Sequence, residues 1–289
     1  MDLRAILMGL AFAVMWSSAF TSARVIVAAA PPLSALALRF LISGLLAVLI
    51  ACAMGQSWRL TRAQWRATFL FGICQNTLYL GLNFVAMQTV QASLAAIIAS
   101  SLPLWVALAQ WRLYGARIRP LGIAGLVAGI AGVTLIMGAR LSGGVDLFGV
   151  GLCIAGVAAL TVATLTLSGA TSGGNFLMIV GLQMLVGSAG LAIPAAAFET
   201  ISIDWSWPLI VAFVYTTLVP GLAATLVWFL LVHRIGAVRA ATFHFLNPFL
   251  GVAIAALILS ERLGPLDIVG VAVITFGILA VQLAKSADA

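Results

Sequence analysis

Long apolar runs, separated by short joints of charged, glycine, proline or small polar residues, follow one another along the whole chain. Crossing the hydrocarbon core of a bilayer as a helix takes about 20 mostly apolar residues. The runs are unbroken and lack the alternation of a transmembrane β-strand. They predict ten transmembrane helices, at residues 5–23, 33–54, 67–87, 93–111, 121–138, 147–168, 176–198, 208–231, 238–259 and 266–284.

The first run admits two interpretations. Arg4 precedes an apolar stretch that is followed by small residues, which is also the pattern of a secretory signal peptide. The run is long, however, carries Trp16, Ser17 and Ser18 at its centre, and has a weak counterpart in the sixth run. These features favour a first helix that stays in the membrane.

Composition supports the same fold class. Of the 289 residues, 64% are hydrophobic and 7% are charged, whereas a soluble domain carries about 25% charged residues. The chain therefore lacks the polar surface of a water-soluble particle. We expect an all-α integral membrane protein, with connectors too short to hold an extramembrane domain.

The charged residues indicate orientation rather than a nucleic-acid partner. The net charge is +7, but most of the arginines lie between apolar runs, and they form no basic stripe with interleaved aromatic residues. Ten basic residues fall on the side of the termini and three on the other, so the positive-inside rule predicts cytoplasmic N and C termini. The three on the other side are Arg24, Arg140 and Arg262.

An internal repeat becomes visible when the sequence is shifted by 145 residues, because residues 92–137 then align with 237–282 without a gap. The identical positions include Pro103 with Pro248, Arg117 with Arg262, and two glycine pairs, Gly125 with Gly270 and Gly132 with Gly277. We expect two five-helix copies, at residues 1–140 and 141–289. Five is odd, so the second copy enters the membrane inverted, as in carriers that work by alternating access. Duplication kept only for packing is the alternative.

The chain also resembles the ten-helix EamA branch of the drug/metabolite transporter superfamily. The resemblance is carried by the Trp16-Ser17-Ser18 centre, by the run from Pro31 to Phe40, and by the second-half pattern. That pattern comprises Ala240, Pro248, Glu261-Arg262-Leu263, Gly270 and Gly277. The resemblance implies a bacterial inner-membrane exporter of amino acids or related metabolites, and looks closest to aromatic amino-acid exporters. One departure is visible, because the first copy has Ala116 where the second has Glu261.

Polar and aromatic side chains near the centres of six runs are the candidate substrate site, since polar groups at membrane depth usually face protein or a wet cavity. They are Trp16 and Ser17; Gln75, Asn76, Tyr79 and Asn83; Ser100, Ser101 and Trp105; Thr161 and Thr164; Tyr215; and Phe243, His244 and Asn247. Hydrogen bonds that only hold the bundle together are the alternative. The fifth and tenth runs are glycine-rich and nearly free of polar atoms, so we expect them to pack outside the cavity, with a dimer contact as the weaker option.

Several residues carry two interpretations each. Pro103, Pro220 and Pro248 interrupt runs and free a carbonyl, so they are candidate hinges or static kinks. Arg39 lies inside the second run, where it either clamps a substrate carboxylate or takes a structural role. His244 is a proton sensor or a neutral hydrogen-bonding residue.

The remaining features separate classes of function. The acids fall near the ends of the runs, which argues against strong cation coupling and cationic cargo. We find no catalytic motif, no metal-ligand spacing and no cofactor signature, so we expect no enzyme. A carrier for a small molecule such as a neutral or aromatic amino acid fits best, as a monomer or weak homodimer in the lipid bilayer. A multidrug exporter or a facilitative channel is the alternative.

Overall fold

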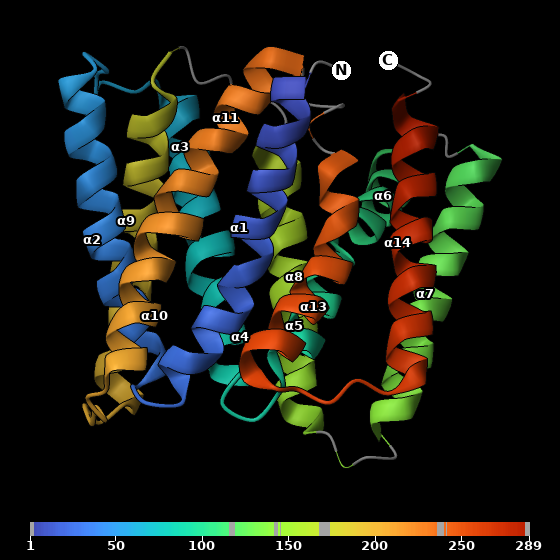
Figure 1. Ribbon diagram of the computed structural model, residues 1–289. Coiled ribbons are helices and arrows are strands. Elements are labelled where there is room, and N and C mark those ends of the chain that lie inside the picture. The colour runs from blue at the N-terminus through green and yellow to red at the C-terminus, as the bar shows by residue number, and fades with distance from the viewer. Residues whose placement is uncertain are drawn as a thin grey trace. The chain divides into compact units, whose positions relative to one another are not determined.

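The computed structural model describes residues 3–115, 119–141, 146–167, 174–235 and 242–286, together with Gly144 and Ala240. Within these residues the regular structure is entirely helical (Figure 1). The α-helices are α1 (Leu3–Val27), α2 (Pro32–Ala53), α3 (Arg62–Phe71), α4 (Leu80–Ala86), α5 (Ala92–Ser100), α6 (Leu102–Tyr114), α7 (Pro120–Leu141), α8 (Leu147–Leu167), α9 (Phe176–Phe198), α10 (Trp207–Leu218), α11 (Ala224–Ile235), α13 (Asn247–Leu259) and α14 (Pro265–Ser286). They are joined by the π-helices η1 (Gly72–Tyr79) and η2 (Val219–Ala223) and the 3₁₀-helix η3 (Thr242–Leu246).

Seven stretches of the described chain are long and apolar enough to cross a bilayer. They are Leu3–Val27, Pro32–Ala53, Arg62–Ala86, Ala92–Leu113, Leu147–Thr166, Phe176–Phe198 and Trp207–Val232. Three shorter apolar helices, Pro120–Ile136, Phe243–Leu259 and Pro265–Val281, lie where the fifth, ninth and tenth spans were predicted. The all-helical membrane architecture is thus confirmed, while the count of ten spans stays a prediction.

Two predicted spans are not single helices. The fourth is divided at Ser101 into α5 and α6, and the described part of the ninth begins with η3 before α13. We expected Pro103 and Pro248 in the middle of kinked helices, but each lies in the first turn of a new helix. There the missing N–H removes no intrahelical hydrogen bond. Pro220 is different, because it lies inside η2, between α10 and α11.

The chain forms two compact units. Unit 1 contains Met1–Thr21, Thr89–Val150 and Ala224–Ala289, and unit 2 contains Ser22–Gln88 and Gly151–Ala223. Each unit therefore takes helices from both halves of the sequence. The chain passes from one unit to the other inside α1, between α4 and α5, near the start of α8, and at the junction of η2 with α11.

In unit 1, α7 and α14 lie side by side (Figure 1). A Cβ on Gly125 would lie 2.6 Å from the Gly277 carbonyl oxygen, and one on Gly132 would lie 2.9 Å from the Gly270 oxygen. Residue numbers rise along one helix as they fall along the other, so the helices are antiparallel. These are the glycines that the 145-residue shift pairs, Gly125 with Gly270 and Gly132 with Gly277. Equivalent helices of the two copies thus run in opposite directions, as an inverted repeat requires.

In unit 2, α2 and α9 form a similar antiparallel pair. The N–H of Leu33 donates to Glu199 Oε1 at 2.8 Å, and the N–H of Met178 donates to Gln56 Oε1 at 2.9 Å. Glu199 follows the end of α9 and Gln56 follows the end of α2, so each helix closes the N-terminus of the other. Leu33 and Met178 are 145 residues apart, which is the repeat shift again. The capping satisfies N–H groups that a helix start leaves without an intrahelical partner.

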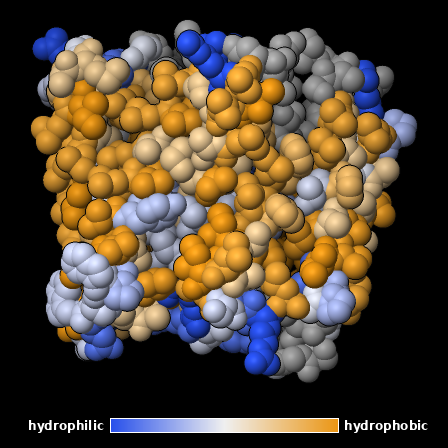
Figure 2. All heavy atoms as spheres, viewed as in Figure 1, coloured by the Kyte–Doolittle hydropathy of each residue, from blue (hydrophilic) through white to orange (hydrophobic). Residues whose placement is uncertain are grey.

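The outward helix faces are apolar. Leu49 on α2 is 65% exposed and Phe276 on α14 is 69% exposed. Hydrophobic residues cover most of the face shown in Figure 2. Such continuous apolar surface is disfavoured in water and is stable against lipid.

Candidate functional site

Aromatic side chains from three elements of unit 1 meet around one histidine. Phe12 and Trp16 lie one turn apart on α1, Trp228 lies on α11, and His244 lies on η3. The His244 ring centroid is 5.1 Å from that of Phe12, 5.0 Å from that of Trp228 and 6.3 Å from that of Trp16. The imidazole is steeply inclined to all three rings, the edge-to-face arrangement that aromatic rings favour. We call these four residues the aromatic cluster.

A chain of polar contacts reaches the same imidazole. Ser17 Oγ lies 3.4 Å from Asn247 Oδ1 and 3.5 Å from the Asn247 main-chain oxygen. Asn247 Nδ2 lies 2.9 Å from His244 Nδ1. Ser17 and Asn247 are 2% and 8% exposed, so the contacts are screened from solvent. A hydroxyl, an amide and an imidazole therefore lie beside flat apolar rings.

The local sequence explains why His244 and Asn247 face the same space. His244 lies in η3 and Asn247 is the first residue of α13, so the two are three residues apart across the junction, and side chains at this spacing lie on the same side of a helix. Pro248 lies in the first turn of α13, a position where proline is well tolerated. The sequence predicted that His244 and Asn247 share one face, but it predicted a regular α-helix where the structure has η3 followed by α13. Phe12 was not among the predicted site residues, and its signal was the four-residue spacing from Trp16 on one face of α1.

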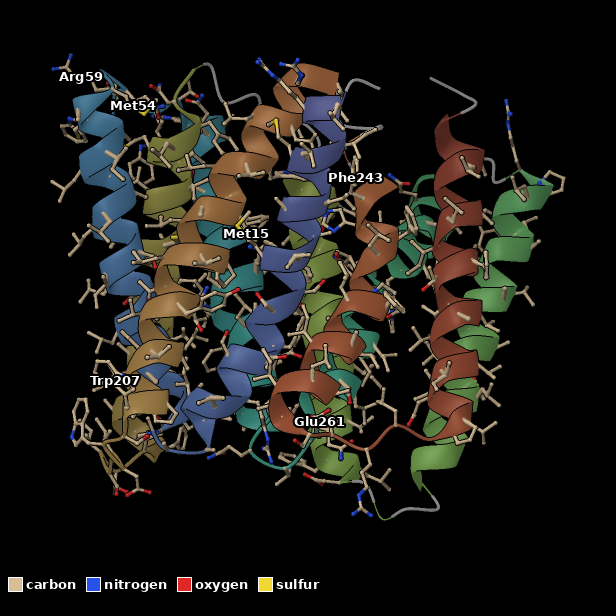
Figure 3. The ribbon with its side chains drawn as sticks, in the orientation of Figure 1. Met15, Met54, Arg59, Trp207, Phe243 and Glu261 are labelled. Atoms are coloured by element: carbon tan, nitrogen blue, oxygen red, sulfur yellow. The ribbon has the colours of Figure 1, made fainter. Side chains whose placement is uncertain are left out.

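Phe243 does not belong to this cluster. It is 7% exposed and packs with Ala5, Leu231 and Ala240 in a buried apolar core of unit 1. Its ring also covers Gly9, where a side chain would collide with it. Figure 3 shows Phe243 beside α1, at the end of the η3–α13 segment opposite Glu261. We interpret Phe243 as a packing residue.

The predicted residues of the fourth span lie where α5 gives way to α6. Ser100 Oγ donates to the Ala96 oxygen and Ser101 Oγ to the Ile98 oxygen, both at 2.6 Å. Trp105 Nε1 donates to Ser101 Oγ at 3.2 Å. These hydrogen bonds stay within the fourth span and give main-chain oxygens near the α5–α6 junction a donor. Trp105 is 36% exposed and makes no ring contact with the aromatic cluster in the described part of the chain.

The third-span residues belong to unit 2 and lie on η1 and α4. Asn76 Nδ2 donates to the Gln183 main-chain oxygen at 2.9 Å, which fastens η1 to α9. Asn83 Nδ2 donates to the Tyr79 oxygen at 2.7 Å. Asn83 Oδ1 is buried and has no hydrogen-bond partner among the described residues. Gln75 lies on η1 and is half-buried.

The other unit 2 candidates are bonded locally or half-buried. Thr161 Oγ1 donates to the Val157 oxygen and Thr164 Oγ1 to the Leu160 oxygen, each at 2.8 Å, as threonines on membrane helices often do. Tyr215 is half-buried on α10. The structure thus distributes the predicted substrate residues over both units.

Arg39 meets the carbonyls of a broken helix. It is 6% exposed on α2, and its Nε donates to the Thr216 main-chain oxygen at 3.2 Å. That oxygen lies four residues before Pro220, which has no N–H to offer it. Ser43, one turn after Arg39, donates through Oγ to the Thr217 oxygen at 3.3 Å. This geometry supports the structural interpretation of Arg39.

The acids of the described chain lie at or near helix ends, as the sequence predicts. Glu261 accepts from the N–H groups of Ala92 (2.8 Å) and Ser93 (3.1 Å) at the start of α5. Asp146, just before α8, accepts from Thr89 Oγ1 at 2.6 Å, and this hydrogen bond lowers the pKa of its carboxyl. No group of three or more histidine, cysteine or acidic side chains that could hold a metal ion occurs in the described ranges. Ala116, the counterpart of Glu261, lies outside them.

Antiparallel pairing of equivalent helices, an apolar exterior, and a cluster of polar and aromatic side chains near the middle of α1 are the features of a membrane transporter built from inverted repeats. The chain belongs to the EamA-like transporter family, whose model matches residues 3–138 and 147–283. It is therefore a multi-pass membrane transporter of small molecules within the drug/metabolite transporter superfamily, and not an enzyme.

Similar proteins agree with this assignment. The chain is 27% identical to the uncharacterized transporter YvbV of Bacillus subtilis, over 86% of this chain and 82% of that protein. It is 25% identical to the uncharacterized inner membrane transporter YedA of Escherichia coli, over 94% and 88%. The aromatic amino acid exporter YddG of Ancylobacter novellus is 30% identical over 48% of each chain. One crystal structure shares the fold over 100% of both chains, with a TM-score of 0.70 and 23% identity.

Proposed function

We propose that this protein exports neutral amino acids with apolar or aromatic side chains across a bacterial inner membrane by alternating access. The observation that carries the proposal is the aromatic cluster with its uncharged polar neighbours, Ser17 and Asn247. Flat rings suit an apolar side chain, and a hydroxyl, an amide and an imidazole suit the polar end of an amino acid. Carboxylates, which would attract cationic drugs, lie at helix ends.

Support also comes from the relatives. YddG, an aromatic amino acid exporter, shares 30% identity over about half of this chain. YedA is an inner membrane transporter. The arginine distribution further supports cytoplasmic termini, which alkaline phosphatase and fluorescent-protein fusions at each end would test.

The decisive experiment is reconstitution of the purified protein into proteoliposomes with a panel of labelled amino acids, with and without a pH gradient. We expect saturable uptake and counterflow of phenylalanine, tryptophan or leucine, and no requirement for a proton gradient. Single-channel currents in planar bilayers would instead support a facilitative channel. Transport of cationic dyes without amino acids would support a multidrug exporter.

A pair of tryptophan variants links transport to the cluster. Trp16→Ala removes a ring of the cluster and should raise the KM for aromatic substrates about tenfold, the effect of a contact of ~1.4 kcal/mol. Trp58→Ala removes a tryptophan that is 66% exposed outside the helices and should leave the KM unchanged. Equal effects of the two changes would contradict the proposed site.

A further inference from the structure

The contacts around His244 bear on which nitrogen carries its proton. A neutral imidazole has one N–H donor and one acceptor nitrogen, and the hydrogen bond at one nitrogen decides the role of the other. Asn247 presents Nδ2, an amide donor, to His244 Nδ1 at 2.9 Å. His244 Nδ1 is then the acceptor, and the proton lies on Nε2.

Asn247 is itself oriented by its neighbour. Ser17 Oγ lies 3.4 Å from Asn247 Oδ1, and a hydroxyl donates to an amide oxygen. The order of donation therefore runs from Ser17 to Asn247 and from Asn247 to His244. Ser17 and Asn247 come from α1 and from the start of α13, so two elements of unit 1 hold the imidazole in one orientation.

The contacts of the ring include no side chain that would stabilise a charged imidazole. Its ring neighbours are Phe12, Trp16 and Trp228, none of which ionises. Four helices contribute to the cluster or pack on η3, namely α1, α11, α13 and α14. Their arginine, lysine, aspartate and other histidine residues all lie within one turn of a helix end: Arg4 and Arg24 on α1, His233 and Arg234 on α11, and Asp267 and Lys285 on α14. Helix α13 has no ionisable residue. A charge on the imidazole would thus have no nearby counterion among the ring's contacts.

We infer that His244 is a fixed neutral donor whose Nε2–H binds the carboxylate of a zwitterionic substrate while the aromatic cluster receives its side chain, with Ser17 and Asn247 as positioning residues. This inference rests on the proposed function. In the described part of the chain, Nε2 makes no hydrogen bond, so the donor is available to a ligand. A neutral donor suits export because it binds a carboxylate without the strong attraction that a full positive charge would add.

Nuclear magnetic resonance tests the proton position without any transport assay. In protein labelled with ¹⁵N-histidine, the signal that disappears in the His244→Gln variant belongs to His244. In the wild type, the ¹⁵N chemical shifts of that signal should be those of the Nε2–H tautomer across pH 6 to 8. A proton on Nδ1 would mean that the Asn247 amide is turned by 180°, and it would overturn the inference.

Substitutions at the positioning residue provide a second test. Asn247→Asp replaces the donor by an acceptor that attracts a proton to Nδ1, so transport, flat with pH in the wild type, should become pH-dependent. Ser17→Ala should weaken transport about threefold without creating pH dependence. A flat profile for Asn247→Asp in folded protein would contradict the relay.

The ligand chemistry is tested with L-phenylalanine, phenylalaninamide and phenethylamine as competitors of labelled phenylalanine uptake. Wild-type protein should prefer the carboxylate compound over phenethylamine by about tenfold or more, since a hydrogen bond to a charged group carries that much. His244→Phe keeps a ring without a donor and should lose the preference, whereas His244→Gln keeps an N–H and should retain most of it. An unchanged preference in His244→Phe would overturn the inference; absence of amino-acid transport in the wild type would instead overturn the proposed function.

Discussion

Arg39 Nε donates to the main-chain oxygen of Thr216 at 3.2 Å, across 177 residues of sequence. Residue 220, four positions later, is proline and offers this oxygen no backbone N–H. A buried carbonyl without a partner is costly in a membrane, where no water can replace the lost bond. The Arg39 side chain therefore supplies a hydrogen bond beside the π-helical break inside a membrane span.

Replacing Pro220 tests whether that break is needed for transport. Pro220→Ala restores an N–H that can donate to the Thr216 oxygen, so α10 should continue as a regular helix. The free energy of unfolding should then rise by ~1 to 3 kcal/mol. Transport should slow about tenfold, because the unit boundary follows η2 directly. Pro194→Ala in α9 is the matched control and should stabilise the protein without slowing it. Equal transport by the two variants would contradict a hinge at Pro220.

Removing the donor should weaken the fold rather than change selectivity. Arg39→Met leaves the Thr216 oxygen buried without its partner, and we expect the free energy of unfolding to fall by ~1 to 3 kcal/mol. Ser43→Ala removes the neighbouring donor and should cost about half as much. Thermal unfolding in detergent measures both. Selective loss of carboxylate-bearing substrates in a fully stable Arg39→Met protein would favour the substrate clamp instead.

The carboxylate of Glu261 should stabilise the start of α5. Glu261→Gln removes the negative charge and one of the two acceptors for the N–H groups of Ala92 and Ser93, and should lower stability by ~0.5 to 2 kcal/mol. Asp204→Asn makes the same charge change at an exposed position outside the helices and should have little effect. If both variants unfold at the same temperature, the cap contributes nothing measurable.

Two glycines of α7, one packed against α14 and one exposed, should differ sharply in their tolerance of alanine. Gly125→Ala places a Cβ within 2.6 Å of the Gly277 oxygen, so the helices must separate, and we expect a loss of ~1 to 3 kcal/mol. Gly138→Ala on the same helix meets nothing within 4 Å and should stabilise the protein by up to ~1 kcal/mol through helix propensity. Differential unfolding of the two variants in one detergent checks the prediction, and equal shifts would reject it.

Much of the architecture could be predicted from sequence because apolar run length and repeat register report directly on span and duplication. The seventh span, 176–198, has the predicted bounds, and the paired glycines at 125 and 270 indicated close helix packing. The sequence indicated that prolines interrupt the spans near Ser101 and η2, but not what kind of break each would be. Whether a proline kinks a helix, starts a new one or lies in a π-helix depends on which distant donor meets the freed carbonyl.

The candidate site was predictable in composition but not in partners. His244 and Asn247 were assigned to one face from their spacing, and in the structure their side chains are in contact. Phe12 was missed because its four-residue spacing from Trp16 marks a shared helix face but does not say which other rings lie against that face. Gln183 was missed for a similar reason, since its main-chain oxygen, and not its side chain, receives Asn76.

The crossed glycine contact has an evolutionary corollary. The contact pairs Gly125 with Gly277 and Gly132 with Gly270, and the repeat shift exchanges these two pairs, so the contact is self-complementary. A single ancestral five-helix chain could therefore form the same contact with an identical molecule inserted in the opposite orientation. Gene fusion would then have preserved an existing homodimer seam. In such a fused chain each half is free to acquire its own chemistry, and the glutamate at 261 opposite alanine at 116 is one such difference.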